Sequence, residues 1–232
     1  MEKKTIYIGA ITLVLMAVFI FVSYTLTKNQ VVEITSIIDG DTIKVKLPND
    51  KIEVVRLEGI NAPEKGMPYY QDAINYLSSF KGKEVLLDNR GKDRYNRILA
   101  YILFNNKPIN EDLLEEGFAH LYIFERDRYT EILEKAETEA RIKNKGLWEK
   151  SLKKQDKCLD IVKEKKVVRI NNICEFSVSL ENYTLKDEGR TVIVLDKKIP
   201  KKSDILVNIA SFPYPNSIFL RNKDGNLVSF YR

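Results

Sequence analysis

The hydrophobic pattern singles out the first thirty residues from the rest of the chain. Residues 5–26 are all uncharged and are rich in Ile, Val, Leu and Phe. At about 1.5 Å per residue, a helix over this run is long enough to cross a hydrocarbon core of about 30 Å. Because Lys3 and Lys4 precede the run, the positive-inside rule keeps the N-terminus in the cytoplasm and exports the remainder. The pattern predicts a single-pass membrane anchor over residues 1–30, with everything after it extracytoplasmic.

A cleaved signal peptide, followed by secretion, is the alternative for this segment. The apolar core of a signal peptide is shorter, about 7–15 residues, and a small-x-small cleavage site follows it. Here the run is longer, and it ends in Ser23-Tyr24-Thr25-Leu26. These features favour an anchor that is not cleaved.

Residues 31–150 alternate between short β-rich runs and amphipathic stretches, the pattern of a mixed α+β domain. Strands are expected over residues 31–38, 42–47, 52–57, 84–89 and 97–104, and helices over 68–80, 110–117 and 127–145. The last helix should bury one apolar face made of Tyr129, Ile132, Leu133, Ala136 and Ala140. Its solvated face should carry the i,i+4 pairs Glu131/Lys135, Glu137/Arg141 and Glu139/Lys143, and Gly146 should cap its C-terminus.

A Lys-rich linker over residues 151–157 precedes a second domain, residues 158–232, which lacks helical periodicity. Short strands are expected over residues 167–170, 177–180, 191–195, 205–209, 217–220 and 227–231. The Lys-Asp-Gly-Asn sequence at Lys223 to Asn226 is a strong hairpin signal. The second domain is therefore predicted to be a small all-β sandwich.

Composition limits the chemistry more by what is scarce than by what is abundant. His120 is the single histidine, so a zinc site with two imidazoles is excluded, and a Ser-His-Asp triad would need His120 as its base. Two cysteines cannot form a four-thiolate zinc site. We interpret His120 as a half-exposed structural residue. Catalysis must therefore rest on carboxylates, Arg, Lys, Tyr or a hard metal ion.

Three segments concentrate polar residues at the predicted strand ends, namely residues 38–42, 56–64 and 93–97. Each has a structural explanation by itself, since Asp-Gly is a common hairpin turn and an Asp-Arg pair is common on surfaces. Together they contain the groups that metal-assisted phosphodiester hydrolysis requires.

The chemistry assigns a role to each group in these segments. A hard divalent cation prefers oxygen ligands, which Asp41, Asn61 and Ala62 can supply. Two arginines can hold a phosphate and stabilise charge developing on phosphorus. Glu64 can position or deprotonate the attacking water.

The order of five motifs resembles the staphylococcal nuclease (thermonuclease) family: "IDGDT", "VRLEGINAPE", "DRYNRILAYI", "LLEEGFAHLY" and a long helix ending in "KGLWEK". The resemblance covers about residues 31–150. It implies a five-stranded OB barrel with three helices, and a calcium-dependent nuclease that acts on DNA and RNA.

The resemblance also implies a role for individual residues. By position, Arg56, Glu64 and Arg97 match the catalytic residues of the family. The calcium site would comprise Asp39, Asp41, Asn61 and the backbone carbonyl of Ala62. The substrate-binding residues would be Asp93, Arg94, Tyr95, Tyr122 and Phe124.

Two departures from the family pattern bear on activity. Asn61 stands where the family has a metal-binding aspartate, so the site loses one negative charge and we expect weaker calcium affinity. The loop after Glu64 is short and lacks a lysine-rich segment. Neither departure removes Arg56, Glu64 or Arg97.

The C-terminal domain resembles a lamin-tail-like domain, an immunoglobulin-like β-sandwich, most specifically in the run "LENYTLKD". Such domains are usually adaptors or tethers, so we expect no catalysis there. Nucleic acid, envelope components and its own nuclease domain remain open as its partner. Cys158 and Cys174 can form a disulfide in an extracytoplasmic domain, while two buried free thiols are the alternative.

The sequence thus predicts a membrane-anchored, calcium-dependent nuclease that degrades single-stranded DNA and RNA outside the cell. A nucleic-acid-binding module with a degraded metal site is the alternative, and a structural envelope protein is a weaker one. The net charge of +5 does not decide among them, because residues 31–150 carry more acidic than basic groups. The basic excess lies in the anchor and in residues 151–232, where it could help to gather a polyanion.

Overall fold

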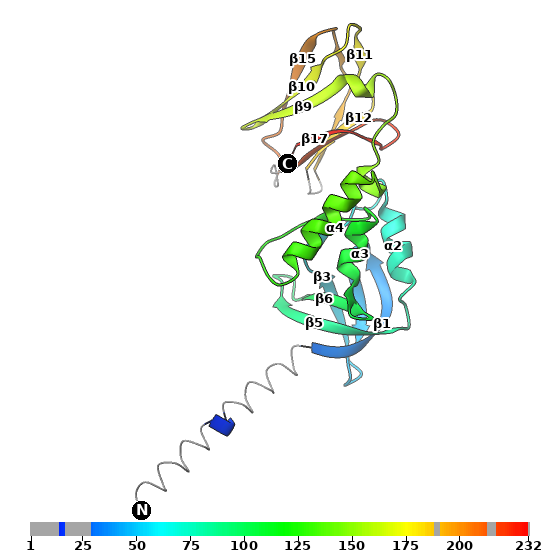
Figure 1. Cartoon of the computed structure of the whole chain (residues 1–232), viewed down its shortest axis with the longest axis vertical. Coiled ribbons are helices and arrows are strands. Elements are labelled where there is room, and N and C mark those ends of the chain that lie inside the picture. The colour runs from blue at the N-terminus through cyan, green and yellow to red at the C-terminus, as the bar shows by residue number, and fades with distance from the viewer. Residues whose placement is uncertain (1–13, 17–28, 188–190, 213–216, 232) are drawn as a thin grey trace, which may run out of the picture.

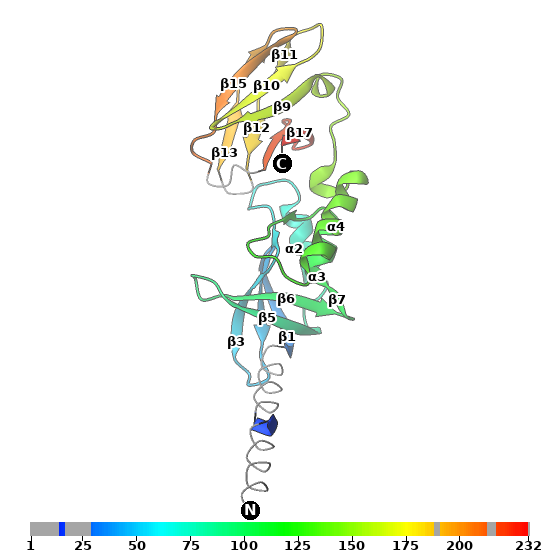
Figure 2. The same cartoon turned by 60° about the vertical axis from the view of Figure 1, so that its left-hand side comes forward.

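The computed structural model describes residues 14–16, 29–187, 191–212 and 217–231 (Figure 1). A β-barrel, a layer of three helices and a group of C-terminal β-sheets follow one another along the long axis of the molecule. In both Figure 1 and Figure 2 the helices lie between the barrel and the C-terminal sheets.

Five strands form the barrel: β1 (Asn29–Asp39), β2 (Thr42–Lys46), β3 (Ile52–Leu57), β5 (Glu84–Lys92) and β6 (Ile98–Phe104). They pair in the order β3-β2-β1-β5-β6, and a parallel pairing of β3 with β6 closes the barrel. This is the OB-like barrel that the sequence predicts. All five expected strands are present, with ends that differ from the prediction by at most three residues.

Alternation of side chains at the closing pair separates the core from the outer surface. Val55 and Leu57 on β3 are buried, and so are their register partners Ile98 and Ala100 on β6. Arg56, between the two buried residues of β3, therefore points to the outside of the barrel.

Three helices cover the barrel: α2 (Tyr70–Ser78), α3 (Ile109–Glu115) and α4 (Thr130–Ile142). Three short strands connect them to the barrel: β4 (Ile60–Asn61), β7 (Lys107–Pro108) and β8 (His120–Leu121). β4 and β8 form a separate two-stranded pair, with Asn61 opposite His120 and Ile60 opposite Leu121.

Helix α4 differs from its sequence prediction in three respects. Ile132 is exposed, whereas Glu137 is buried and accepts a hydrogen bond from the Leu121 N–H at 2.8 Å. Asn144 adopts a positive φ of 52°, so the helix ends before Gly146, which instead begins the 3-10 turn η1 (Gly146–Trp148). The burial of Glu137 follows from tertiary structure, because only folding brings β8 to this face of the helix.

The described residues of the C-terminal part form three antiparallel sheets after the 3-10 turn η2 (Asp156–Cys158). The first comprises β9 (Leu159–Glu164), β10 (Val167–Asn172) and β15 (Ser203–Asn208). The second comprises β12 (Tyr183–Lys186), β13 (Val192–Leu195), β16 (Ile218–Arg221) and β17 (Leu227–Tyr231). The third pairs β11 (Val178–Ser179) with β14 (Lys198–Ile199). Residues from the two larger sheets share one hydrophobic core. The sequence pattern missed β9, β12 and β14.

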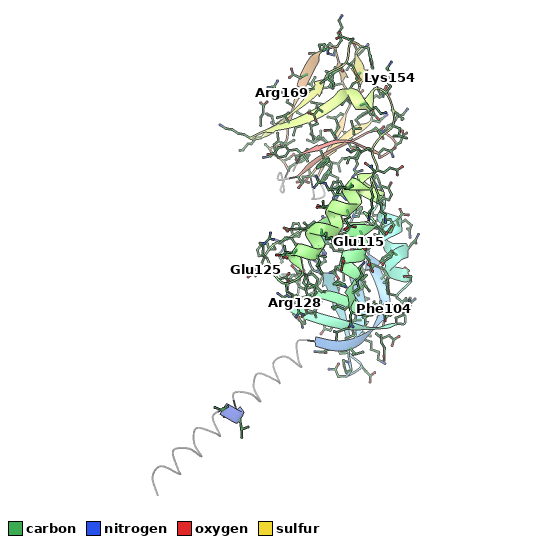
Figure 3. All side chains as sticks on the ribbon, viewed as in Figure 1. Phe104, Glu115, Glu125, Arg128, Lys154 and Arg169 are labelled. Carbon is green, nitrogen blue, oxygen red and sulfur yellow. A yellow bond between two sulfur atoms is a disulfide. The ribbon has the colours of Figure 1, made fainter. Side chains whose placement is uncertain are left out.

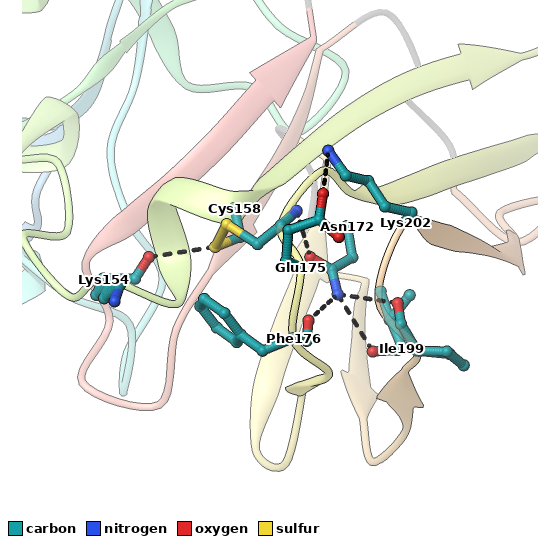
Figure 4. The surroundings of a disulfide bond; sticks show 9 residues. Lys154, Cys158, Asn172, Glu175, Phe176, Ile199 and Lys202 are labelled. Carbon is teal, nitrogen blue, oxygen red and sulfur yellow. Dashed lines mark hydrogen bonds and ion pairs between the residues drawn. A yellow bond between two sulfur atoms is a disulfide. The ribbon is translucent and has the colours of Figure 1, made fainter.

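Cys158 and Cys174 form a disulfide, and their Cα atoms are 5.3 Å apart (Figure 4). The bond joins the end of η2 to the segment that follows β10. Next to it, the amide of Asn172 donates to the carbonyl oxygens of Phe176 and Pro200, at 2.7 and 2.9 Å. These contacts fix the segment between β10 and β11 against its neighbours.

Most of the predicted anchor, residues 5–26, lies outside the described residues. Within it the structure describes residues 14–16, which are helical. In the described part of the chain, no helix has both the length and the apolar character needed to span a membrane.

Candidate active site

A close approach of the β1–β2 turn to the segment after β4 assembles the candidate site. A Cβ atom on Gly40 would lie 2.7 Å from Cβ of Ala62 and 2.8 Å from Cβ of Ala73 on α2. Only glycine leaves room for this contact. It brings Asp39 and Asp41, on either side of Gly40, next to Asn61 and Ala62.

Asp41 is the centre of the hydrogen-bond network in the site. One carboxylate oxygen accepts the Thr42 hydroxyl at 3.0 Å, and the other accepts the Ala62 N–H at 2.9 Å. The Asp41 N–H in turn donates to the Asp39 carboxylate at 3.1 Å. Two backbone segments far apart in the sequence are therefore locked together through one carboxylate.

Arg56 spans the same group of residues. Its guanidinium lies 3.0 Å from the second oxygen of Asp41, donates to the Asn61 side-chain oxygen at 3.3 Å, and donates to the Leu57 carbonyl. Only 14% of the Arg56 and 12% of the Asp41 side-chain surface is exposed. At this burial the ion pair is only weakly screened by solvent, so the arginine is held in one orientation.

The balance of charge leaves Asp41 short of positive partners. Burial raises its pKa to about 6, and the nearby Asp39 carboxylate raises it as well, although Arg56 and the hydrogen bonds from Ala62 and Thr42 oppose both effects. A bound cation would relieve this excess of buried negative charge.

The donor set fits a hard divalent cation such as calcium, the ion typical of the family that the sequence resembles. Carboxylate oxygens of Asp39 and Asp41, the amide oxygen of Asn61 and the carbonyl of Ala62 are all oxygen ligands of the kind that calcium prefers. Within the described residues there is no cluster of three or more His, Cys, Asp or Glu side chains suited to a metal. That result is expected for this set, because two of its four donors are an amide and a backbone carbonyl.

Glu64 lies two residues beyond Ala62, on the segment that Asp41 holds in place. It is half-buried, and its carbonyl accepts the Met67 N–H at 2.9 Å in a tight turn. The turn fixes the backbone on which the Glu64 carboxylate is mounted.

Arg97 directly precedes β6 and ends the turn that begins at Asp93. Its side-chain Nε donates to Asp93 at 2.8 Å, and the Arg97 N–H donates to the other carboxylate oxygen at 2.9 Å. The exposed ring of Tyr95 contacts two guanidinium groups, with its centroid 4.7 Å from Arg94 and 5.6 Å from Arg97. The side chains of Asp93, Arg94, Tyr95 and Arg97 thus form one surface cluster.

The register of the closing strands places Arg56 and Arg97 on the same face. Arg56 lies opposite Leu99 in the parallel pair, and Arg97 precedes Leu99 by two residues. Because strand side chains repeat every two residues, both arginines point outward from the same side of the barrel.

The two later aromatic residues differ in their surroundings. Tyr122 directly follows β8, and its N–H donates to the Gly59 carbonyl at 2.9 Å. This bond places Tyr122 beside the short connection between β3 and β4. Phe124 is 86% exposed in the loop before α4.

His120 is more buried than the sequence suggested. It is 9% exposed, so the expectation of a half-exposed residue was wrong. Its ring stacks on Phe219 of the C-terminal sheet, at 4.4 Å between centroids. The sequence could not reveal this cover, because the residue that provides it is almost one hundred positions away.

Sequence reasoning missed two groups that support the site. Thr42 orients Asp41, and the "GDT" run was the available signal. Glu58 lies two residues from Arg56, and burial raises its pKa against the opposing effect of Arg56. No local pattern distinguishes Glu58 from a surface glutamate.

Comparison with known proteins is consistent with this geometry. The profile of the staphylococcal nuclease homologues matches residues 54–150. An uncharacterized endonuclease of Haemophilus influenzae is 32% identical over 135 residues, covering 58% of this chain and 75% of that protein. The thermonuclease of Staphylococcus intermedius is 33% identical over 124 residues, covering 49% and 73%. Endonuclease YncB of Bacillus subtilis is 35% identical over 126 residues, covering 49% and 59%.

These matches do not identify the C-terminal part as a lamin-tail-like domain. They concern the barrel and its helices, where the site lies. With this coverage and identity, the chain belongs to the staphylococcal nuclease family and is a nuclease.

Proposed function

We propose that the chain is a calcium-dependent phosphodiesterase that cleaves single-stranded DNA and RNA. The observation that carries the proposal is the buried Asp41–Arg56 ion pair, which joins the oxygen-donor cluster to the outward-facing arginine surface. A cation site and a phosphate site thereby share one wall.

The residues that would hold calcium are Asp39, Asp41, Asn61 and, through its carbonyl, Ala62. When bound, calcium would act as a Lewis acid on a phosphoryl oxygen and neutralise part of its charge. The chain's own groups provide the remaining functions.

Arg56 and Arg97 would bind the scissile phosphate from the outer face of the barrel. A guanidinium can donate two parallel hydrogen bonds to phosphate oxygens. Its positive charge stabilises most strongly when phosphorus becomes pentacoordinate, because negative charge then builds up on the phosphate oxygens. The ion pairs with Asp41 and Asp93 preorganise both side chains before substrate arrives.

Glu64 would orient a water molecule and accept its proton at a carboxylate oxygen as the water attacks phosphorus. The P–O bond to the leaving oxygen then breaks. Because Glu64 and the donor Asn61 lie on one short segment, the water and the phosphate are positioned by the same stretch of backbone.

A nucleic-acid-binding module remains the second candidate, and one contact favours it. Asn61 replaces a carboxylate and its oxygen accepts a hydrogen bond from Arg56, so the donor set carries less charge. A binder, however, has no need of Glu64 beside the donors.

Location and the second domain complete the proposal. Residues 1–30 would anchor the chain in the membrane with both domains on the outer face. The C-terminal part would be a lamin-tail-like, immunoglobulin-like sandwich. Support comes from the uncharged run 5–26 and from the two larger sheets that share one core.

One assay distinguishes the candidates. The full-length chain, purified in detergent, is incubated with labelled single-stranded DNA or RNA in calcium or in chelator. We expect cleavage in calcium alone. Binding without cleavage in either condition would favour the binding module. If the chain neither binds nor cleaves nucleic acid, a structural role is the remaining interpretation.

A further inference from the structure

The hairpin of β16 and β17 packs directly on the nuclease domain. Phe219 and Phe230 enclose Trp148 from η1, with ring centroids 5.9 and 5.6 Å away. The Arg141 guanidinium of α4 lies over the Phe230 ring at 4.6 Å. Ala140 completes this separate hydrophobic cluster, which contains residues from both parts of the chain.

Backbone hydrogen bonds reinforce the same junction. Leu227 N–H donates to the Glu149 carbonyl at 3.0 Å, and Ser151 N–H donates to the Leu227 carbonyl at 2.8 Å. Arg221 is 6% exposed and donates to the Leu147 carbonyl at 2.8 Å. A junction with buried aromatics and paired backbone behaves as one packed body rather than as two domains on a flexible linker.

One contact of this junction leads to the metal-donor residue. Phe219 stacks on His120 with an angle of 27° between the rings. His120 is the register partner of Asn61 in the two-stranded pair of β8 with β4. Two successive contacts, the stacking of Phe219 on His120 and the pairing of His120 with Asn61, therefore connect the C-terminal sheet to a residue of the proposed calcium site.

A second contact leads to the segment that follows Glu64. A Cβ atom on Gly225 would lie 2.6 Å from Cγ of Pro68, so the hairpin turn abuts this segment directly. Nearby, the Tyr69 hydroxyl donates to the Glu149 carboxylate at 2.6 Å. Pro68 and Tyr69 are thus in contact with the junction, while Lys65 and Gly66 are exposed.

We propose that the β16–β17 hairpin is a positioning element of the nuclease site, in which Phe219 acts through His120 on Asn61 and the turn at Gly225 acts through Pro68 on the Glu64 segment. The proposal rests on the nuclease function proposed above. It assigns the second domain a part in cleavage without placing any of its residues on the substrate.

The division of contacts predicts a specific kinetic signature. The hairpin supports the segment with Asn61 and Glu64, whereas Arg56 lies on β3 and Arg97 directly precedes β6, and these two strands hold one another. Loosening the hairpin should therefore lower kcat while leaving KM for DNA almost unchanged. The value of kcat is taken per folded molecule. A general loss of folded protein then lowers only the active fraction and leaves kcat unchanged.

The test compares Phe219→Leu with Phe212→Leu in the full-length chain. Phe212 is also buried but belongs to the C-terminal core away from the junction. We expect Phe219→Leu to lower kcat at least fivefold with KM within twofold, and Phe212→Leu to leave both unchanged. Tyr69→Phe, which removes only one exposed hydrogen bond, should lower kcat about twofold.

Hydrogen–deuterium exchange provides a readout that does not depend on activity. Phe219→Leu should speed exchange of residues 60–69, and Phe212→Leu should not. If Phe219→Leu leaves kcat and this exchange at wild-type values, or if both variants change them equally, the proposal is overturned. A wild-type chain that shows no calcium-dependent cleavage would instead refute the proposed function, and faster exchange would still report the mechanical link.

A pocket on the C-terminal part carries a second, independent inference. It has a volume of about 520 Å³ and is lined by Lys153, Lys154, Gln155, Phe176 and Lys223. Phe176 is 38% exposed, and the Lys154 ammonium lies 5.7 Å from its ring centroid. Figure 3 shows Lys154 at the right-hand side of the C-terminal part, beyond the helices, and Figure 4 shows both Lys154 and Phe176 close to the disulfide.

The chemistry of this pocket suits a single nucleic-acid strand. Three of its five lining residues are lysines, and one of them, Lys153, pairs with Asp224, so a positive excess remains. Ammonium groups bind phosphates and an exposed ring offers a stacking surface for a base. We infer that the pocket binds phosphate and base of a single strand outside the nuclease site.

Binding to fluorescein-labelled oligo(dT), followed by anisotropy in chelator, tests this inference without cleavage. Lys154→Glu with Lys223→Glu should weaken binding at least fivefold and flatten its salt dependence, and Phe176→Ala should weaken it about threefold. The control, Lys165→Glu with Lys166→Glu, makes the same charge change in the β9–β10 turn. The inference is overturned if the control variant weakens DNA binding equally. It is also overturned if Lys154→Glu with Lys223→Glu abolishes binding of the chain to anionic lipid vesicles while its DNA binding stays intact.

Discussion

Arg56 is the residue on which the site converges, because it touches a carboxylate, an amide and a carbonyl at once. The motif around it could be read from sequence, since strand alternation places a charged residue between buried Val55 and Leu57. Its partner Asp41 was also identified in advance. What the sequence could not give is the burial of their ion pair, which depends on the contact at Gly40.

The amide at position 61 leads to a prediction about metal affinity. Asn61→Asp restores a carboxylate beside Asp41, so calcium should bind roughly tenfold more tightly. Isothermal titration of the chain with calcium measures the change directly. Asn208→Asp, which adds the same charge on strand β15, should have no effect. Unchanged affinity in Asn61→Asp would exclude position 61 from the metal site.

Gly40 leads to a steric prediction. In Gly40→Ala the added carbon would approach Ala62 and Ala73 to within 2.8 Å, so the β1–β2 turn must shift. We expect a loss of about 1–3 kcal/mol of stability and a large loss of cleavage. Gly82→Ala is the control, since nothing lies within 4 Å of its added carbon. Backbone strain should cost Gly82→Ala about 1 kcal/mol while cleavage stays normal; normal cleavage by Gly40→Ala would contradict the account.

At the scale of elements, hydrophobic periodicity predicted what local pattern can encode. All five barrel strands and the three helices were anticipated within a few residues. Strands β9, β12 and β14 were not, because linker-like charge or brevity obscures their alternation. Glu137 was assigned to a solvated face and is buried, since β8 supplies a backbone donor that no helical pattern could announce.

The disulfide leads to a prediction for the C-terminal sheets. The bond closes a loop with a sequence separation of 16, which stabilises the folded state by about 3 kcal/mol in the chain-entropy description. Urea unfolding followed with and without reductant should show this loss. The Cys158→Ser/Cys174→Ser double variant should be less stable and indifferent to reductant. Alkylation of both cysteines in the native, unreduced protein would refute the bond.

At the scale of the whole molecule, the barrel, the helices and the C-terminal sheets are joined in one line. The sequence predicted a linker over residues 151–157 and left the nuclease domain as one possible partner of the C-terminal domain, but it did not predict which residues make the contact. The structure pairs Lys150 with Leu227 and buries Trp148 between the two parts. Local patterns cannot report such a contact, because its members are far apart in the chain.

The anchor leads to a prediction about location. If residues 1–30 hold the chain in the membrane, the protein should sediment with membranes and be released by detergent rather than by high salt. N-terminal sequencing of the membrane-bound form should begin at or near Met1. A mature chain that starts near Lys28 and stays in the soluble fraction would contradict the anchor.

The most direct test of the central claim is the comparison of Glu64→Gln with wild type on labelled single-stranded DNA, in calcium and in chelator. The substitution keeps the size of the side chain, but the resulting amide cannot accept a proton from water. We predict that the variant binds DNA as wild type does and loses at least a hundredfold in calcium-dependent cleavage. Normal cleavage by Glu64→Gln would contradict the account.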